Sequence, residues 1–319
     1  MQCVVTSESR DLEERNKYMK DKAGSRGFIT IATGNERYYR LAVNLLRSYR
    51  QFAKDPVPFA LIADRENEYT REFDDVVIIS DPDNSYNDKL KLYREMPYDE
   101  TIFIDADSLA YGDLNAWWDM FADAGDFSLF GYAWRDLNCG RGWFVPEGMG
   151  KYRDSFSFIP DFNGGVYYMR RTETCARVFE IANECAAQYS DYQFRGFATP
   201  ADEPVLALGM AVCGLEPLDL PGELVFAPTR QKLDADISVP RAVYKKSDTV
   251  QYPVRLVHFS NYRTTLSFYR GEIQKLEDLR NHRSTGRIKR AMSMGWYYLG
   301  DVAALYKRAA KKLKRVLRK

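Results

Sequence analysis

Apolar residues along most of the chain form short β-branched runs that alternate with segments of helical spacing. Strands alternating with helices predict an α/β domain with a mostly parallel central sheet covered on both faces. The expected strands lie at residues 27–32, 58–63, 76–79, 101–104, 166–169 and 254–259. The expected helices lie at residues 38–52, 89–96 and 176–187.

Polar residues follow two of these expected strands directly. The first strand ends in a Thr-Gly-Asn turn at residues 33–35, and the strand at 101–104 runs into Asp105-Ala106-Asp107. Ligands of open α/β sheets bind at the carboxyl ends of the strands. If strand alternation continues through the D-x-D motif, residues i and i+2 project from the same face, so Asp105 and Asp107 project together. We therefore expect a ligand site at this edge of the sheet.

Two adjacent carboxylates repel each other unless a cation or a proton lies between them. Mg²⁺ and Mn²⁺ prefer oxygen ligands and often share them with substrate phosphates. The Asp105/Asp107 pair thus indicates a metal ion that holds a phosphorylated ligand, although a lone D-x-D is also found in ordinary strand-end turns. The dinucleotide fingerprint G-x-G-x-x-G and the P-loop G-x-x-x-x-G-K-[ST] are both missing from the sequence.

Charge divides the chain unevenly. The formal net charge is +1 over 319 residues, but residues 280–319 hold 13 Lys or Arg and one acidic residue, so the remainder is net acidic. Residues 1–26 are polar, without the apolar segment of a secretory signal, and no apolar run is long enough to span a membrane. These features predict a polar leader (1–26), a catalytic domain (27–275) and a basic, amphipathic helical tail (276–319).

The tail suggests a location for the protein. Its apolar residues recur at helical steps among the cations, as expected of a helix that lies on an anionic membrane surface, or of one that docks on its own domain or a partner. Nucleic acid is not expected as a partner. The five cysteines are odd in number and include no C-x-x-C, which is typical of a reducing compartment. We expect a cytoplasmic protein, peripheral on the inner face of a membrane, and homo-oligomerisation stays open.

Residues 131–160 are rich in Gly, Trp, Arg and Pro. We expect a long aromatic loop here, which is either a lid or acceptor wall or an ordered packing loop. The segment Asp161-Phe162-Asn163-Gly164-Gly165 follows and leads into the expected strand at 166–169.

Several motifs in register resemble the retaining glycosyltransferases of family eight, the group that includes glycogenin and the lipopolysaccharide galactosyltransferases. Each motif alone is a weak signal, and their order and spacing over residues 27–265 carry the resemblance. They are Asn35 and Tyr38, Asp-Lys-Leu-Lys-Leu at 88–92, Phe-Ile-Asp-Ala-Asp-Ser-Leu at 103–109, Gly-Asp-Leu at 112–114, Phe-Asn-Gly-Gly-Val at 162–166, Asp-Glu at 202–203 and Val-His-Phe at 257–259.

The resemblance implies a GT-A fold, a Rossmann-like nucleotide-diphospho-sugar transferase fold. It also implies a metal-dependent, retaining transfer of a hexose from a UDP-sugar to a glycan or lipid-linked acceptor. The implied ligands of Mn²⁺ (or Mg²⁺) are Asp105, Asp107 and His258, and the implied catalytic residues are Asp202, Asn163 and Glu203. Asp202 would act either as a nucleophile or as a stabiliser of an oxocarbenium-like state. The implied nucleotide-sugar contacts are Thr33, Asn35, Tyr38, Lys89, Asp105, Ala106, Asp107, Gly164, Gly165 and Arg263.

This chain departs from the family pattern at two places. The family follows Val-His-Phe with G-x-x-K-P-W, whereas residues 260–265 here read Ser-Asn-Tyr-Arg-Thr-Thr, so Arg263 would have to replace the lysine. The planar guanidinium fork of arginine is not equivalent to an ammonium. In addition, Glu203 stands where the family usually has Gln. Both departures bear on the identity of the sugar more than on the reaction.

Three other functions compete with glycosyl transfer. A haloacid dehalogenase-type phosphatase also opens with a strand and D-x-D, but it needs Thr or Val where Leu109 stands. A nucleotidyltransferase needs a Gly-rich phosphate loop, which is missing. A non-catalytic nucleotide-sugar or membrane-binding module is disfavoured by the intact D-x-D and His258, and turnover would distinguish it from an enzyme.

Overall fold

The computed structural model describes residues 24–229, 231–239, 241–283, 301–302 and 306, and it divides the chain into two units. Unit 1 comprises the described residues up to Leu46, then Lys54–Ala106 and Asn115–Pro221. Unit 2 comprises Arg47–Ala53, Asp107–Leu114 and the described residues after Pro221. Most of the predicted leader and most of the predicted basic tail lie outside the described residues.

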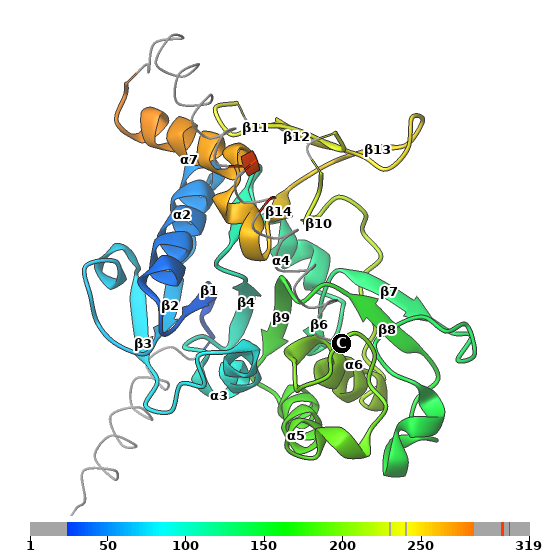
Figure 1. The fold of residues 1–319 in the computed structure, drawn as a ribbon. Helices are drawn as coiled ribbons and strands as arrows, with labels where there is room; N and C mark the ends of the chain where they lie inside the picture. Colours follow the sequence, from blue (N-terminus) through cyan, green and yellow to red (C-terminus); the bar gives the residue numbers. More distant parts are fainter. Residues whose placement is uncertain (1–23, 230, 240, 284–300, 303–305, 307–319) are drawn as a thin grey trace, which may run out of the picture. The chain divides into compact units, whose positions relative to one another are not determined.

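A six-stranded sheet forms the centre of unit 1, in the order β3-β2-β1-β4-β9-β6 (Figure 1). The pairs β3-β2, β2-β1 and β1-β4 are parallel, whereas β9 is antiparallel to both β4 and β6. The predicted α/β class with a mostly parallel sheet is therefore confirmed. The strands are β1 (Arg26–Ala32), β2 (Phe59–Ala63), β3 (Asp75–Ile78), β4 (Glu100–Ile104), β6 (Phe127–Ser128) and β9 (Val166–Arg170).

Helix α2 (Glu36–Phe52) forms where the apolar spacing predicts it, beginning two residues earlier. Its apolar stripe of Leu41, Leu45, Leu46 and Tyr49 is buried, which supplies the packing that stabilises an amphipathic helix. The predicted helix at 89–96 divides into a 3₁₀ segment η2 (Tyr86–Lys91) and one turn of α-helix, α3 (Leu92–Glu95).

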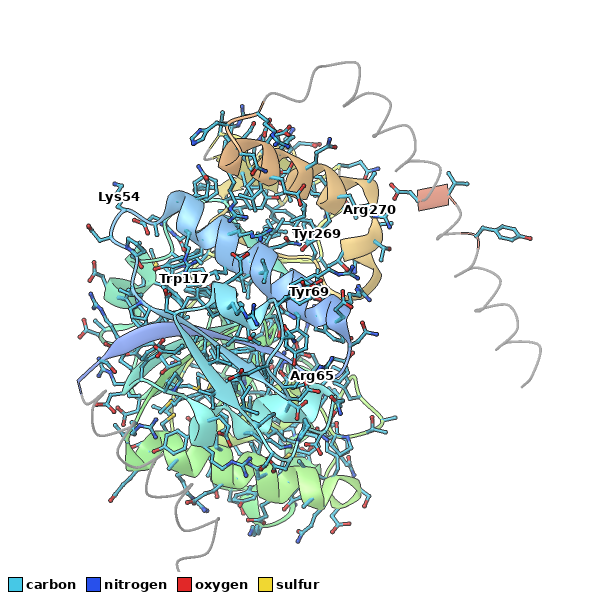
Figure 2. All side chains as sticks on the ribbon, turned by 90° about the vertical axis from the view of Figure 1, so that its left-hand side faces the viewer. Lys54, Arg65, Tyr69, Trp117, Tyr269 and Arg270 are labelled. Carbon is cyan, nitrogen blue, oxygen red and sulfur yellow. The ribbon has the colours of Figure 1, made fainter. Side chains whose placement is uncertain are left out.

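The other described α-helices of unit 1 are α4 (Ala116–Phe121), between β4 and β6 in the chain, and α5 (Glu173–Ala187) and α6 (Asp202–Val212), which come after β9. Trp117 of α4, labelled in Figure 2, is fully buried and packs edge-on against Phe130. Helices α5 and α6 lie side by side (Figure 1). Helix α5 begins at a Thr172 cap whose hydroxyl accepts a hydrogen bond from the Cys175 backbone N–H at 3.2 Å.

The expected long loop at residues 131–160 is shortened at both ends by strands and runs over residues 135–158. The segment begins with β7 (Gly131–Trp134) and ends in β8 (Ile159–Phe162), and these two strands pair antiparallel. Aromatic residues of period two can build such strands, and the Gly and Pro content that suggested a loop belongs to the connection between them. The short 3₁₀ turns of unit 1 are η1 (Thr70–Glu72), η3 (Pro146–Gly148), η4 (Gly150–Tyr152) and η5 (Tyr189–Asp191).

The described residues of unit 2 after Phe52 form two small sheets and the helix α7. In the first sheet, β14 lies between β10, to which it is parallel, and β5, to which it is antiparallel; the second has the order β11-β12-β13. The predicted strand at 254–259 is shortened to β14. The elements are β5 (Ser108–Ala110), β10 (Leu224–Phe226), β11 (Leu233–Asp236), β12 (Arg241–Lys245), β13 (Gln251–Pro253), β14 (Leu256–His258), η6 (Asn261–Thr265) and α7 (Ser267–Arg280).

Helix α7 presents a buried Tyr269 and an exposed Arg270, both labelled in Figure 2. At its first turn, the Asp301 carboxylate accepts hydrogen bonds from the Ser267 backbone N–H (2.8 Å) and hydroxyl (2.5 Å). A carboxylate in this position satisfies the unpaired N–H groups of a helix N-terminus and favours its dipole. Within the residues that the structure describes, none of the helices combines the length and the apolar composition needed to cross a bilayer.

Candidate active site

The D-x-D motif lies in a turn and not in a continuing strand, so the expectation of strand alternation through it is wrong. Strand β4 ends at Ile104, and the Asp105 backbone N–H donates to the Gly165 carbonyl at 2.9 Å, one step beyond the β4–β9 ladder. Ala106 and Asp107 form a turn, and β5 then begins at Ser108. The reversal of the chain, and not the pleat, places the two carboxylates.

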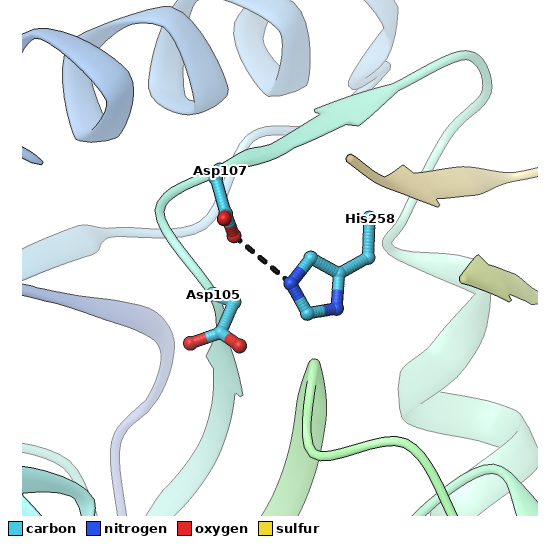
Figure 3. Close-up of side chains that lie close together, drawn as sticks. All are labelled: Asp105, Asp107 and His258. Atoms are coloured by element: carbon cyan, nitrogen blue, oxygen red, sulfur yellow. Dashed lines mark ion pairs between the residues drawn. The ribbon is translucent and has the colours of Figure 1, made fainter. Parts of the chain in front are cut away.

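Strand pairing in unit 2 holds His258 against Asp107. Ser108 is the register partner of His258, and the Phe259 backbone N–H donates to the Asp107 carbonyl at 3.0 Å. The His258 Nε2 atom lies 2.9 Å from Asp107 Oδ1, and the histidine is buried. Asp105 lies close to this pair (Figure 3). Asp105, Asp107 and His258 each offer one possible ligand atom, and these three atoms all lie within 4.8 Å of one another.

These three side chains suit a divalent metal ion. Two carboxylates provide hard oxygen ligands and an imidazole provides a nitrogen, a mixed set that Mn²⁺ accepts readily and Mg²⁺ less so. Asp105 and Asp107 are both partly exposed, so ligand atoms are accessible from solvent. The predicted trio of metal ligands is thus brought together as a possible metal site.

Lys89 is the centre of a buried charge cluster in unit 1. Its ammonium lies 2.9 Å from Asp105 Oδ2 and 3.0 Å from Asp202 Oδ2, and it donates to the Gly164 carbonyl at 3.0 Å. Burial opposes the charge on Lys89, but the neighbouring Asp105 and Asp202 carboxylates outweigh burial and raise its pKa above the ordinary value. Lys89 therefore remains an ammonium ion within the cluster.

Asp202 and Glu203 lie in the first turn of α6, where the helix dipole favours negative charge. The Tyr167 hydroxyl donates to Asp202 Oδ2 at 2.6 Å, which adds to the ion pair with Lys89. Burial, followed by the nearby Asp202 carboxylate, raises the pKa of the Tyr167 hydroxyl well above its ordinary value, so it stays a donor. Asp202 is consequently held by two partners in a pocket that leaves its side chain 3% exposed.

Glu203 is held differently from its neighbour. Its Oε1 atom accepts hydrogen bonds from the Gly164 backbone N–H at 2.8 Å and from the Asn163 amide at 3.0 Å. Burial and the adjacent Asp202 charge raise the pKa of Glu203 above its ordinary value, and the Gly164 hydrogen bond lowers it in part. Among the described residues, both hydrogen bonds of Glu203 fall on Oε1, which leaves Oε2 for a ligand.

Gly164 is required by the packing of this cluster. A Cβ atom added to it would lie 2.4 Å from the Tyr167 hydroxyl oxygen, 2.7 Å from Asp202 Oδ2 and 2.9 Å from Glu203 Cγ. Real Cβ atoms do not approach other atoms this closely, so any larger residue would displace the two acidic side chains. The sequence suggested that Gly164 lets a sugar come close to the backbone. In the structure, the glycine also makes room for the side chains of Tyr167, Asp202 and Glu203.

The turn after β1 is fixed by hydrogen bonds to residues far along the chain. The Thr33 hydroxyl donates to Asp88 at 2.9 Å, and the Gly34 backbone N–H donates to Asp64 at 3.1 Å. Asn35 Oδ1 accepts from the Arg37 backbone N–H at 2.8 Å, so this side chain caps α2. The predicted base-contacting residue Tyr38 is 46% exposed, which leaves its ring available for stacking.

Sequence reasoning missed Asp64, Arg65 and Tyr167. Asp64 ends β2 beside the Gly34 turn, and Arg65 (labelled in Figure 2) donates to Asp64 at 2.8 Å and to the Gly34 carbonyl at 2.9 Å. The position of Asp64 after an apolar strand was a usable signal, whereas nothing in the local pattern marked Tyr167. Arg263 lies in η6 of unit 2, five residues after His258.

The structure was compared with known proteins. LgtC, a galactosyltransferase crystallised with donor and acceptor sugar analogues, is similar to this chain with a TM-score of 0.51 and 16% sequence identity. The match covers 82% of this chain and 97% of the LgtC chain. WbbM, a bifunctional glycosyltransferase in its apo form, matches 87% of this chain and 52% of its own (TM-score 0.47, 13% identity). For an active-site Gln-to-Glu variant of LgtC, the match covers 83% of this chain and 99% of the variant's chain (TM-score 0.49, 15% identity). No protein-family model and no curated protein sequence matches the chain.

The chain has the GT-A fold of LgtC. This confirms the fold that the family-eight motifs implied. At 16% identity the likeness establishes the fold alone, and the chemistry has to be argued from the residues of the site.

Proposed function

We propose that the protein is a metal-dependent, retaining glycosyltransferase that moves a hexose from a UDP-sugar to a glycan or lipid-linked acceptor. The observation that carries this proposal is the Asp105, Asp107 and His258 cluster at the carboxyl end of β4 on a GT-A fold. The carboxyl ends of parallel strands are where open α/β folds bind their ligands.

The residues of the site divide between the two parts of the donor. We assign Thr33, Asn35 and Tyr38 to the nucleoside, with the exposed Tyr38 ring against the base. Asp105 and Asp107, with His258, would hold Mn²⁺ or Mg²⁺, which when bound stabilises the negative charge that grows on the departing diphosphate. Arg263, in η6, would add a second positive charge in place of the family's lysine.

The two acidic residues of α6 receive different roles. Asp202 is paired with Lys89 and accepts a hydrogen bond from Tyr167, so we assign it to positioning the donor and not to attack on the anomeric carbon. Glu203 has its Oε1 fixed by Asn163 and Gly164 and can direct Oε2 at the sugar, where it stabilises positive charge or forms a covalent adduct. Mass spectrometry of trapped enzyme would show a glycosyl adduct on Glu203 in the second case; an adduct on Asp202 would overturn this assignment.

Calorimetric titration of UDP tests the donor class directly. We expect binding in the presence of Mn²⁺, loss of binding in EDTA and loss in Asp107→Ala. Asp123→Ala, which removes an exposed carboxylate of unit 1, serves as the matched control and should bind like the wild type. Absence of UDP binding under all conditions would contradict the proposal.

Turnover distinguishes an enzyme from a binding module. Release of UDP from a panel of UDP-hexoses, measured with and without added oligosaccharide, should depend on Mn²⁺ and disappear in Asp107→Ala. Metal-dependent UDP binding without any turnover would favour the non-catalytic alternative.

We further propose that the basic tail binds anionic membrane surfaces, at about 1 kcal/mol per cation near the surface. This places the enzyme peripherally on the cytoplasmic face of a membrane, close to lipid-linked acceptors. Co-sedimentation with vesicles of anionic lipid should be lost when residues 290–319 are removed. Equal sedimentation of both proteins would contradict the proposal.

A further inference from the structure

Partly exposed aromatic rings form a row in unit 1, which we call the aromatic row: Trp143, Phe197 and Tyr86. The Trp143 and Phe197 ring centroids lie 5.7 Å apart, and those of Phe197 and Tyr86 lie 6.3 Å apart. Tyr86 is 54% exposed, and the other two rings are half-buried. Large apolar rings grouped at the surface of a domain mark a binding surface more often than single exposed residues do.

Backbone pairing fixes the row in place. Phe144 and Phe194 form an isolated antiparallel bridge, and the Arg195 backbone N–H donates to the Trp143 carbonyl at 2.8 Å. The Trp143 indole N–H donates to the Phe162 carbonyl at 3.0 Å, so the ring is anchored at its polar end. Its position is therefore set by the scaffold, as expected of a recognition surface that loses little entropy on binding.

Gly196 lets the backbone pass close to the Trp143 ring. A Cβ atom at this position would lie 3.0 Å from Trp143 Cζ3, and the backbone φ of +85° is one that other residues rarely adopt. By contrast, the neighbouring Trp134 ring is covered by the Arg141 guanidinium at 5.6 Å and donates its N–H to Asp161 at 2.9 Å. Both tryptophan rings are partly buried, but they differ in the groups that the structure places against them.

Each end of the aromatic row adjoins a segment that carries a residue proposed to bind the nucleotide-sugar donor. At one end the Trp143 ring packs edge-on against Phe162, the residue immediately before Asn163. At the other end Tyr86 opens η2, which carries Lys89 three residues later. The row accordingly runs between the sugar-facing β8–β9 turn and the segment that supplies the buried lysine.

We propose that the aromatic row binds the acceptor as a saccharide, by stacking of its pyranose rings on Trp143, Phe197 and Tyr86. The inference rests on the proposed function, because it names the class of acceptor for that reaction. The C–H groups on one face of a pyranose carry slight positive charge, which matches the negative face of an aromatic ring, and the apolar surface is buried at the same time. A lipid carrier would attach beyond the saccharide and is not needed for this contact.

The test uses full-length protein on a glycan array that displays neutral hexose, hexosamine and uronic acid oligosaccharides, with and without UDP and Mn²⁺. The oligosaccharide that binds best is then titrated calorimetrically against Tyr86→Ala, Phe197→Ala and the conservative Trp143→Phe. We expect the alanine variants to bind it about tenfold more weakly, because each loses one stacking contact. Tyr132→Ala, which removes an exposed ring outside the row, should bind like the wild type.

The outcomes separate this inference from the proposed function. If the wild type binds UDP but no oligosaccharide on the array, or if the alanine variants bind like the wild type, the aromatic row is not the acceptor site. If the wild type binds an oligosaccharide through the row but does not bind UDP, the row is supported as a saccharide site and the donor assignment fails. Unchanged UDP binding in Tyr86→Ala and Phe197→Ala confirms that these variants are folded.

Discussion

Each unit contains a lysine between carboxylates, and the two clusters differ in whether their charges and hydrogen bonds are satisfied internally. In unit 2, Lys275 lies 2.7 Å from Glu272 and 3.0 Å from Asp236. Glu272 also accepts from the Ile237 backbone N–H at 2.7 Å, and Asp236 accepts from the Ser238 backbone N–H and hydroxyl at 2.9 Å and 2.6 Å. This cluster completes its own interactions and joins α7 to the end of β11.

The cluster in unit 1 has one ammonium for three carboxylates. Lys89 pairs with Asp105 and Asp202, while Glu203 accepts hydrogen bonds from Gly164 and Asn163 and interacts with the Lys89 charge at longer range. Asp202 is buried and Glu203 is partly buried at the N-terminus of α6, where the helix dipole favours negative charge and burial opposes it. The same residue types therefore join two elements in unit 2 and lie at the proposed sugar site in unit 1.

The largest effect should come from Lys89→Met. It leaves the buried Asp202 and the partly exposed Asp105 without the Lys89 ammonium, and removing one partner of a buried ion pair typically costs about 3–5 kcal/mol of unfolding free energy. We expect the variant to unfold at much lower urea concentration and to lose UDP binding. Lys89→Arg keeps the charge and should recover most stability but not full binding, since the guanidinium is larger and planar. A Lys89→Met protein that matches the wild type in both assays would show that the cluster is not held by this lysine.

Gly164→Ala should have the next largest effect. Its Cβ atom would lie within 3 Å of Tyr167, Asp202 and Glu203, so we expect a loss of about 1–3 kcal/mol and of activity as the two acidic side chains are displaced. Gly112→Ala is the matched control, since its Cβ would meet the Arg255 side chain at an ordinary 3.5 Å. Urea denaturation and UDP-sugar turnover should separate the two variants; equal behaviour would contradict the steric argument.

Lys275→Met should have a smaller effect and leave donor binding intact. Glu272 loses its ammonium partner but keeps the Ile237 N–H, and it can take up a proton, so we expect a cost of about 1–2 kcal/mol. Calorimetry should give the same UDP affinity as the wild type. A loss of UDP affinity without a change in stability would mean that this cluster is not purely structural.

The sequence predicted the elements whose patterns are local and periodic. Residues 27–32 and 58–63 are short, apolar and almost fully buried in the structure, so their strands were visible without tertiary information. In unit 2 the sequence predicted β14, within the expected strand at 254–259, but not β10 and β13, which have three residues each and show no period. Such strands exist through pairing with partners distant in sequence, which no local pattern records.

The sequence predicted which residues form the candidate site but not the contacts that hold them. The trio Asp105, Asp107 and His258 was expected from motifs, and the structure brings it together through a turn. The pairing of Lys89 with Asp202 joins residues 113 positions apart, and Tyr167 entered no motif, so neither contact could be read from the sequence. The roles of these residues remain predictions until the donor is bound.

The smallest expected effect is a pH dependence carried by Glu272, which sharpens the contrast between the clusters. Burial raises the pKa of Glu272 above its ordinary 4.5, against the opposing effects of Lys275 and the Ile237 N–H. A carboxyl group with a raised pKa in the folded state contributes stability below pH 4.5 that is lost as the pH rises through the raised value. The unfolding free energy of the wild type relative to Glu272→Gln should therefore fall as the pH rises above 4.5 and through the raised pKa of Glu272. Glu66→Gln, at an exposed position, should show no such trend, and a difference that is constant or rises with pH would refute the assignment.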